Sequence, residues 1–140
     1  MQGLYFEDLS EGQSAELTRV ASAAVVEAFA ELSGDVNPVH MDEAYAKTTS
    51  FGQRIAHGML GAAYISAVIG TRLPGPGAVY VNQTLRFRRP VRLGDKVTAR
   101  VTVRELNPRR GLVTLDTVCE VDGKAAMDGE ATIIVPRRPA

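Results

Sequence analysis

Residues 57–70 read His-Gly-Met-Leu-Gly-Ala-Ala-Tyr-Ile-Ser-Ala-Val-Ile-Gly, and this stretch decides the fold. Its residues are apolar or small nearly all round, and a helix without a polar face is buried on most sides. The glycines and alanines within it allow a sheet to approach closely. Gly70 and the nearby Pro74 fit the end of such a helix. The stretch therefore predicts one long central helix that a sheet must cover.

The sequence around this helix supplies the sheet. Residues 13–20 predict a first strand and residues 22–33 an amphipathic helix. After the central helix, apolar and polar residues alternate with a period of two, and the strands expected there lie around 85–88 and in 97–103, 113–119 and 129–135. Turn residues at 107–111 and the pair Asp122-Gly123 separate these strands and suit tight hairpins. The order predicts an α+β domain in which an antiparallel sheet packs on the long helix.

The segment Asp35-Val36-Asn37-Pro38-Val39-His40 carries the chemistry. Pro38 has no N–H and pushes the residue before it out of the helical region, so we expect the helix over 22–33 to stop near Gly34. We expect the next helix no earlier than Asp42, running to Lys47. The segment between is then a tight turn, in which the side chains of Asp35 and His40 converge. Such a turn is also ordinary Asp/Asn chemistry, so its neighbours in the sequence decide its meaning.

Those neighbours complete a known pattern. Phe29-x-x-Leu32-Ser33-Gly34-Asp35-x-Asn37-Pro38-x-His40, followed by His57-Gly58-Met59, resembles the hydratase 2 signature of the MaoC-like family, which contains the R-specific enoyl-CoA hydratases. The resemblance is strongest over residues 29–66. It implies a hot-dog fold, a single domain over residues 1–140, a homodimer, and reversible syn addition of water to a trans-2-enoyl-CoA that gives an (R)-3-hydroxyacyl-CoA.

The resemblance also implies roles for single residues. Asp35 and His40 correspond to the catalytic dyad that holds a water and moves its protons, although the sequence does not say which residue performs which step. Gly58 matches the oxyanion-donor position, and an N–H in the first turn of a helix is left unbonded by the helix and lies at its positive end. Asn37 fits a scaffold role that ties the loop. The resemblance places His57 and Ser66 beside the site as supporting groups.

The two halves of the substrate have candidate contacts elsewhere. Ala62, Ile65 and Ile69 are candidate walls of the acyl pocket. Arg86 and Arg88 lie on one face of a predicted strand and are candidates for the phosphates of coenzyme A. A solvated outer face of the sheet is the alternative interpretation of the two arginines.

Composition narrows the possible partners and cellular compartments of the protein. The chain has 140 residues with 16 basic and 16 acidic side chains, a balance that does not favour nucleic acid as a partner. Its one cysteine, Cys119, allows no internal disulfide and suits a reducing compartment, so we expect a cytoplasmic protein. Neither an apolar signal core at the N-terminus nor a run long enough to span a bilayer is present, so we expect no membrane partner. The inferred reaction needs no cofactor.

Three alternatives remain open at this point. Asp35, His40 and His57 form a possible set of two histidines and one carboxylate for a metal, although their spacing is not typical of a pair on one helix or strand. The second alternative is a 3-hydroxyacyl-[acyl carrier protein] dehydratase. The third is a non-hydratase acyl-thioester binding module or a thioesterase on the same fold.

Overall fold

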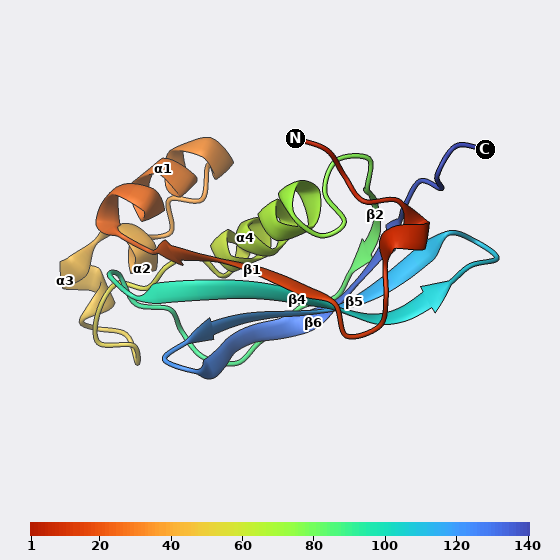
Figure 1. Ribbon diagram of the computed structural model, residues 1–140. Helices are drawn as coiled ribbons and strands as arrows, with labels where there is room; N and C mark the ends of the chain where they lie inside the picture. Colours follow the sequence, from red (N-terminus) through yellow and green to blue (C-terminus); the bar gives the residue numbers. More distant parts are fainter.

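The computed structural model describes residues 1–140 as six antiparallel strands that wrap one side of a long helix. The strands run in the order β1-β4-β5-β6-β2, and the short β3 pairs with β6 (Figure 1). Their bounds are β1 (Ser14–Val20), β2 (Val79–Gln83), β3 (Arg86–Phe87), β4 (Lys96–Asn107), β5 (Leu112–Val121) and β6 (Lys124–Ile134). A short 3₁₀ turn, η1 (Phe6–Asp8), precedes β1.

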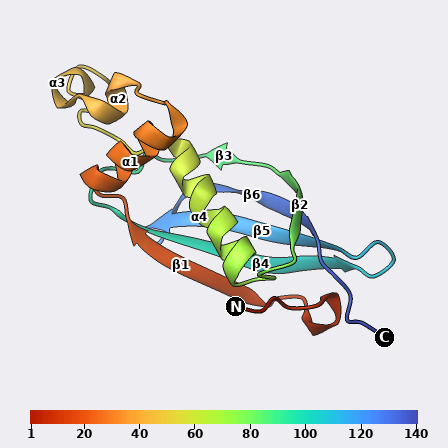
Figure 2. The same cartoon turned by 90° about the horizontal axis from the view of Figure 1, so that it is seen from above.

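The expected central helix is α4 (Gly58–Thr71), and it lies along the concave side of the sheet (Figure 2). Its Ile65 and Val68 are fully buried with 0% exposure, in one core with Val101 and Leu115 of the sheet. Burying a side chain of this size contributes about 1.5–3 kcal/mol. The apolar character of α4 is therefore explained by the sheet around it. None of the helices combines the length and apolar character that a membrane crossing requires.

The long strands of the sheet follow from alternation and tight turns. Along β4, buried and partly exposed residues alternate from Val97 to Val103. The β5–β6 hairpin turns at Asp122 and Gly123, whose φ angles of 51° and 75° belong to the left-handed region that this turn requires. These features confirm the strands predicted over 97–103 and 113–119 and the antiparallel arrangement.

The three remaining helices gather at the end of the sheet near the start of α4 (Figures 1 and 2). Helix α1 (Ala23–Ser33) is capped by the Ser22 side chain and ends at Gly34, whose φ is 81°. The expectation that no helix begins before Asp42 is wrong: α2 (Pro38–Met41) begins at the proline itself. A proline fits the first helical position, because the N–H it lacks has no partner there. Asp42 caps α3 (Glu43–Ala46) through its side chain, as the sequence predicts.

The edges of the sheet differ from the expectation in three ways. The sequence did not predict β2, the strand around 85–88 contracts to the two residues of β3, and β6 begins at Lys124 rather than at residue 129. The exposure of its side chains explains why the sequence does not predict β2. Val79, Tyr80 and Val81 are all exposed, so this edge strand has no alternation of buried and exposed residues.

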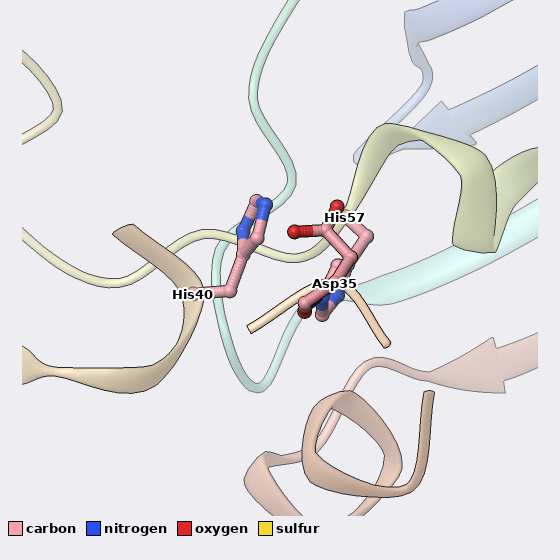
Figure 3. A group of neighbouring side chains, drawn as sticks. All are labelled: Asp35, His40 and His57. Carbon is pink, nitrogen blue, oxygen red and sulfur yellow. Dashed lines mark hydrogen bonds between the residues drawn. The ribbon is translucent and has the colours of Figure 1, made fainter. Parts of the chain in front are cut away.

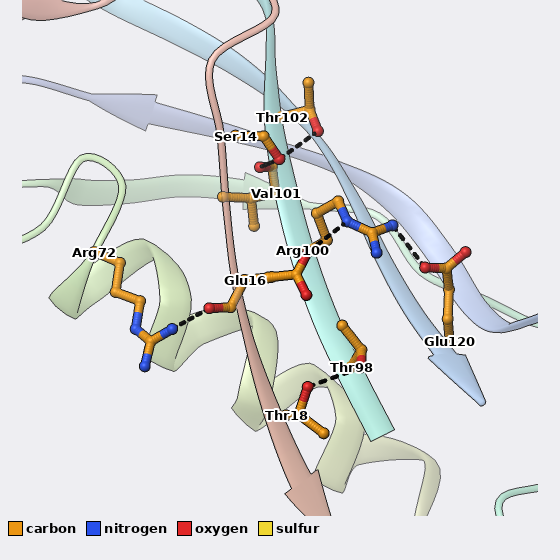
Figure 4. A network of polar contacts seen from close by, with 9 residues as sticks. All are labelled: Ser14, Glu16, Thr18, Arg72, Thr98, Arg100, Val101, Thr102 and Glu120. Carbon is orange, nitrogen blue, oxygen red and sulfur yellow. Dashed lines mark hydrogen bonds and ion pairs between the residues drawn. The ribbon is translucent and has the colours of Figure 1, made fainter. Parts of the chain in front are cut away.

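The outer face of the sheet carries a ladder of charges. Arg100 of β4 bridges Glu16 of β1 at 3.1 Å and Glu120 of β5 at 2.6 Å (Figure 4). Hydrogen bonds to both carboxylates raise the pKa of Arg100. Arg72, at the end of α4, donates to the main-chain oxygen of Glu16 and ties the helix to β1.

Candidate active site

The loop between α1 and α2 is shaped by three local hydrogen bonds. The Asp35 N–H donates to the Ser33 hydroxyl at 3.1 Å. The Asn37 N–H donates to Oδ1 of Asp35 at 3.2 Å, and the Asn37 side-chain oxygen accepts from Val39 N–H at 3.2 Å. Asn37 therefore ties the loop and caps α2. The exposed Asp35 carboxylate keeps its second oxygen, Oδ2, free for another group.

His40 is held with one ring nitrogen committed and the other free. Its Nδ1 lies 2.8 Å from the main-chain oxygen of Ile55, and its exposure is only 8%. A carbonyl oxygen only accepts, so Nδ1 carries the hydrogen. In the neutral imidazole, Nε2 is then the nitrogen without a hydrogen. That tautomer makes His40 a proton acceptor at Nε2, as a general base requires.

Asp35, His40 and His57 converge although they are separated in the sequence. One carboxylate oxygen and one nitrogen from each imidazole lie within 4.8 Å of one another (Figure 3). The two imidazole rings stack, with centroids 3.9 Å apart and an interplanar angle of 30°. The expected convergence of Asp35 and His40 in one small volume is thus present in the structure.

The segment from Arg54 to Gly58 runs alongside this loop and anchors it. Ile55 N–H donates to the Val39 carbonyl at 3.2 Å, and the Arg54 Nε–H donates to the His40 carbonyl at 2.7 Å. Further along the segment, Nε2 of His57 lies 2.8 Å from the main-chain oxygen of Asp35. Together with the bond from His40 to Ile55, these contacts fix the loop to the start of α4.

Gly58 is the first residue of α4, with His57 as the residue that precedes it. The helix cannot bond its own first N–H groups, and they lie at its positive end. A Cβ built on Gly58 would meet Cε1 of Phe87 at 2.6 Å. The absence of a side chain therefore lets the Phe87 ring pack directly against the start of α4.

A cavity of about 370 Å³ opens at this point, between the start of α4 and the sheet. His40, His57 and Gly58 line it together with Phe87, and most of its other walls are apolar. A donor N–H, an imidazole and apolar walls are thus combined in one space. This combination suits a polar group attached to an acyl chain.

The other helix residues predicted from the sequence lie around this cavity rather than in its wall. Ile65 and Ile69 are buried in the core, and Ala62 packs against the core from a partly exposed position. The cavity wall contributed by α4 consists of Gly58, Leu60, Gly61 and Tyr64. Ser66 is exposed and makes no hydrogen bond through its side chain within the chain. Its supporting role stays a prediction.

The two arginines chosen as phosphate contacts differ in their surroundings. Arg88 forms a two-pronged ion pair with Asp128, at 3.0 and 3.1 Å, and also lines the cavity. Arg86 is opposite Asp128 in the β3–β6 pairing, and no ion pair involves it. It lines a second hollow with Thr84 and Gly129. Arg86 therefore offers the less neutralised positive charge of the two.

The stacking of the two imidazoles does not favour a metal at this site. The bonds from His40 to the Ile55 carbonyl and from His57 to the Asp35 carbonyl do not bear on this question, because metal-binding histidines make such bonds with their second nitrogen. The ring centroids lie 3.9 Å apart at an interplanar angle of 30°, so the in-plane lone pairs point side by side rather than at one common point. Binding one cation through both imidazoles would require the rings to leave this stacked arrangement.

Some contributors to the site were not anticipated. The Ile55 carbonyl decides the tautomer of His40, but a main-chain oxygen leaves no signal in the sequence. Phe87 was visible only as one residue of an alternating strand. Arg54 lies between two loops, and its contact with the His40 carbonyl depends on tertiary packing.

A helix enclosed by an antiparallel sheet, with a carboxylate and an imidazole at the helix start, defines a hot-dog protein with a candidate acyl-thioester site. Residues 7–125 match the family model described as the MaoC like domain. The chain belongs to the MaoC-like family.

Named relatives agree over nearly the whole chain. It is 59% identical over 134 residues to the (R)-specific enoyl-CoA hydratase of Rhodospirillum rubrum, covering 96% of this chain and 93% of that protein. It is 52% identical to the 3-hydroxybutyryl-CoA dehydratase of Methylorubrum extorquens, covering 96% and 86%. The solved structure of the unliganded R-hydratase PhaJ1 from Pseudomonas aeruginosa has a TM-score of 0.92 and 47% identity, covering 97% of this chain and 88% of that one.

Proposed function

We propose that this protein is an (R)-specific enoyl-CoA hydratase that adds water reversibly to trans-2-enoyl-CoA. The observation that carries the proposal is the convergence of Asp35 and His40 beside the first N–H of α4. The similarity to (R)-specific enoyl-CoA hydratases over 96% of the chain supports it independently.

The proposed reaction divides between three groups. Nε2 of His40 takes a proton from a water molecule held between His40 and the free oxygen of Asp35, and the hydroxyl bonds to C3 of the enoyl group. Electron density moves to the thioester oxygen, where the Gly58 N–H stabilises the enolate-like charge. The proton that His40 took from the water then passes by way of Asp35 to C2, which returns both residues to their starting protonation states. Delivery of both parts from one side gives syn addition and an (R)-3-hydroxyacyl product.

The proposed substrate path follows the start of α4. The thioester lies in the space between His40 and Gly58, and the acyl chain extends into the cavity along Leu60, Gly61 and Tyr64 of α4. The phosphates of coenzyme A lie outside, near the arginines around β3. This path places the apolar and charged halves of the substrate in matching surroundings.

We propose a homodimer formed at the β2 edge of the sheet. Strand β2 ends the strand order, so one side of its backbone has no partner strand. Val79 and Val81 are 55% and 54% exposed on this strand, and Ile134 of the adjacent β6 is 44% exposed. Pairing with a second copy covers this apolar edge and satisfies its backbone. We place the enzyme in the cytoplasm, since its one cysteine is free.

The test uses shape-preserving variants at the two proposed catalytic residues. Asp35→Asn and His40→Gln remove proton transfer, and each should lower turnover of a trans-2-enoyl-CoA by about 10²–10⁴-fold. The assay follows loss of the conjugated thioester absorbance, and melting curves on the same preparations report folding. Asp42→Asn, a cap of α3 outside the site, is the matched control and should keep its turnover. Folded Asp35 and His40 variants with normal turnover would contradict the proposal.

The same assay separates the alternative activities. A panel that offers the enoyl group on coenzyme A and on acyl carrier protein should show preference for coenzyme A. Release of free thiol instead of hydration would indicate a thioesterase. Binding without either reaction would indicate a silent thioester module.

A further inference from the structure

His57 is the most enclosed polar side chain of the site, yet the proposed reaction assigns it no proton step. Its exposure is 3%, and Nδ1 is buried without a hydrogen-bond partner. Nε2 lies 2.8 Å from the main-chain oxygen of Asp35, so this nitrogen carries the hydrogen and donates it. With one nitrogen enclosed and the other committed, His57 has no group free to exchange protons with a substrate.

The contacts of His57 nevertheless reach every proposed catalytic group. Its hydrogen bond fixes the main chain of Asp35, 22 residues away in the sequence. Its ring stacks on His40 with a centroid separation of 3.9 Å. Its own main chain leads directly into Gly58, the proposed oxyanion donor. Phe29 of α1 packs against the same ring at 4.9 Å and limits its movement.

We propose that His57 is a positioning residue that holds Asp35, His40 and the first N–H of α4 in one geometry. The inference rests on the proposed roles of Asp35 and His40. The hydrogen bond from His57 to the Asp35 carbonyl fixes the distance between the Asp35 loop and the ring of His40. The stacked ring sets the direction in which Nε2 of His40 faces the substrate. A shift of about 1 Å in such an arrangement costs on the order of 10²-fold in rate.

Three substitutions separate the two contacts. His57→Gln keeps an Nε2–H donor and loses the ring, His57→Phe keeps a ring and loses the donor, and His57→Leu loses both. We expect His57→Leu to lower kcat by about 10²-fold with KM changed by less than about threefold. His57→Gln and His57→Phe should each recover part of kcat. Thr117→Val, which removes a buried hydroxyl bonded to Gln83 away from the cavity, is the control for lost stability and should keep kcat.

A second background distinguishes positioning from general weakening. When His40→Gln has already removed the base, adding His57→Leu should cost less kcat than it costs in the wild-type background, because the part of the loss that arises through His40 is already gone and only the positioning of Asp35 and Gly58 remains to be lost. The same 10²-fold loss in both backgrounds would overturn the proposal. A folded His57→Leu with normal kcat would also overturn it, as would a loss confined to KM. If His57→Leu does not fold, His57→Gln and His57→Phe decide the matter: partial kcat supports positioning, and normal kcat in both contradicts it.

These variants distinguish failure of the proposed catalytic role of His40 from failure of the positioning role of His57. A near-normal His40→Gln single variant refutes the proposed catalytic role of His40, and positioning by His57 falls with it. A strongly impaired His40→Gln together with an unimpaired His57 series refutes positioning alone.

Discussion

Adding a side chain at Gly58 tests the point where the fold and the proposed chemistry meet. A Cβ there would lie 2.6 Å from Cε1 and 3.0 Å from Cδ1 of Phe87. Carbon atoms at optimal contact are about 3.5–4.0 Å apart, so the ring must move by roughly 1 Å. Phe87 is 58% exposed, and its ring can turn toward solvent. Gly58→Ala should therefore lower the free energy of unfolding by less than the ~1–3 kcal/mol typical of an overpacked core.

The expected effect on the reaction is larger. We expect the added methyl group to push the Phe87 ring away and to crowd a thioester oxygen bound at the Gly58 N–H, and the branched Cβ of Gly58→Val should increase the crowding. Removal of one oxyanion donor costs about 2.7–4 kcal/mol of barrier, or 10²–10³-fold in kcat. We expect Gly58→Val to lose turnover by about this amount, with Gly58→Ala in between. Hydration rates and melting curves on the same preparation give turnover per folded molecule.

Phe87→Ala supplies the matched control, because it removes the crowded ring and leaves the Gly58 N–H unchanged. If Gly58→Val acts by blocking the thioester oxygen, the double variant stays impaired. If it acts only by displacing Phe87, the double variant regains the turnover of Phe87→Ala. That recovery, or normal turnover per folded Gly58→Val molecule, would refute the oxyanion role and leave Gly58 as a packing residue.

Three further predictions concern the sheet. Val81→Lys at the proposed dimer edge should reduce the mass measured by light scattering from that of two chains to that of one. Val20→Lys on the opposite edge strand should leave the mass at two chains. If both variants stay dimeric, the interface lies elsewhere. Arg86→Gln should raise KM for enoyl-CoA more than Arg88→Gln, whose charge Asp128 already neutralises, and equal or absent effects would remove both from phosphate binding. Burial raises the pKa of the Cys119 thiol from 9.0 to about 12. The free energy of unfolding should therefore not depend on this thiol below pH 9.0 and should fall as the pH rises toward 12. Alkylation of Cys119 near neutral pH should require unfolding, and ready alkylation of the folded protein would contradict this.

The parts of the fold that could be predicted are those where burial repeats along the chain. The unbroken apolar run of α4 and the alternation in β4 and β5 reflect faces that meet the core, so periodicity found them. Strand β2 has no such signal, because its residues from Val79 to Asn82 are all exposed and no buried face repeats along it. Helix α2 differs from the expectation for another reason. Pro38 disfavours a helix that ends in front of it, but at the first helical position it begins one.

The residues of the candidate site also fall into two groups, those that the sequence indicates and those that it does not. Asp35, His40 and Gly58 could be selected because their side chains, or the lack of one, are visible in the sequence. The parts that orient them are main-chain atoms and distant contacts: the Ile55 carbonyl that sets the tautomer of His40 and the bond from His57 to Asp35. No residue pattern records such contacts, because they exist only after the loop packs against the start of α4.

The most direct test of the central claim is the stereochemistry of hydration in deuterated water. The purified protein is given trans-2-butenoyl-CoA in deuterium oxide, and the product is resolved on a chiral column and examined by NMR. We predict (R)-3-hydroxybutyryl-CoA with deuterium at C2 on the face that received the hydroxyl, since one water between Asp35 and His40 supplies both. An S product, deuterium on the opposite face, or no hydration would contradict the account.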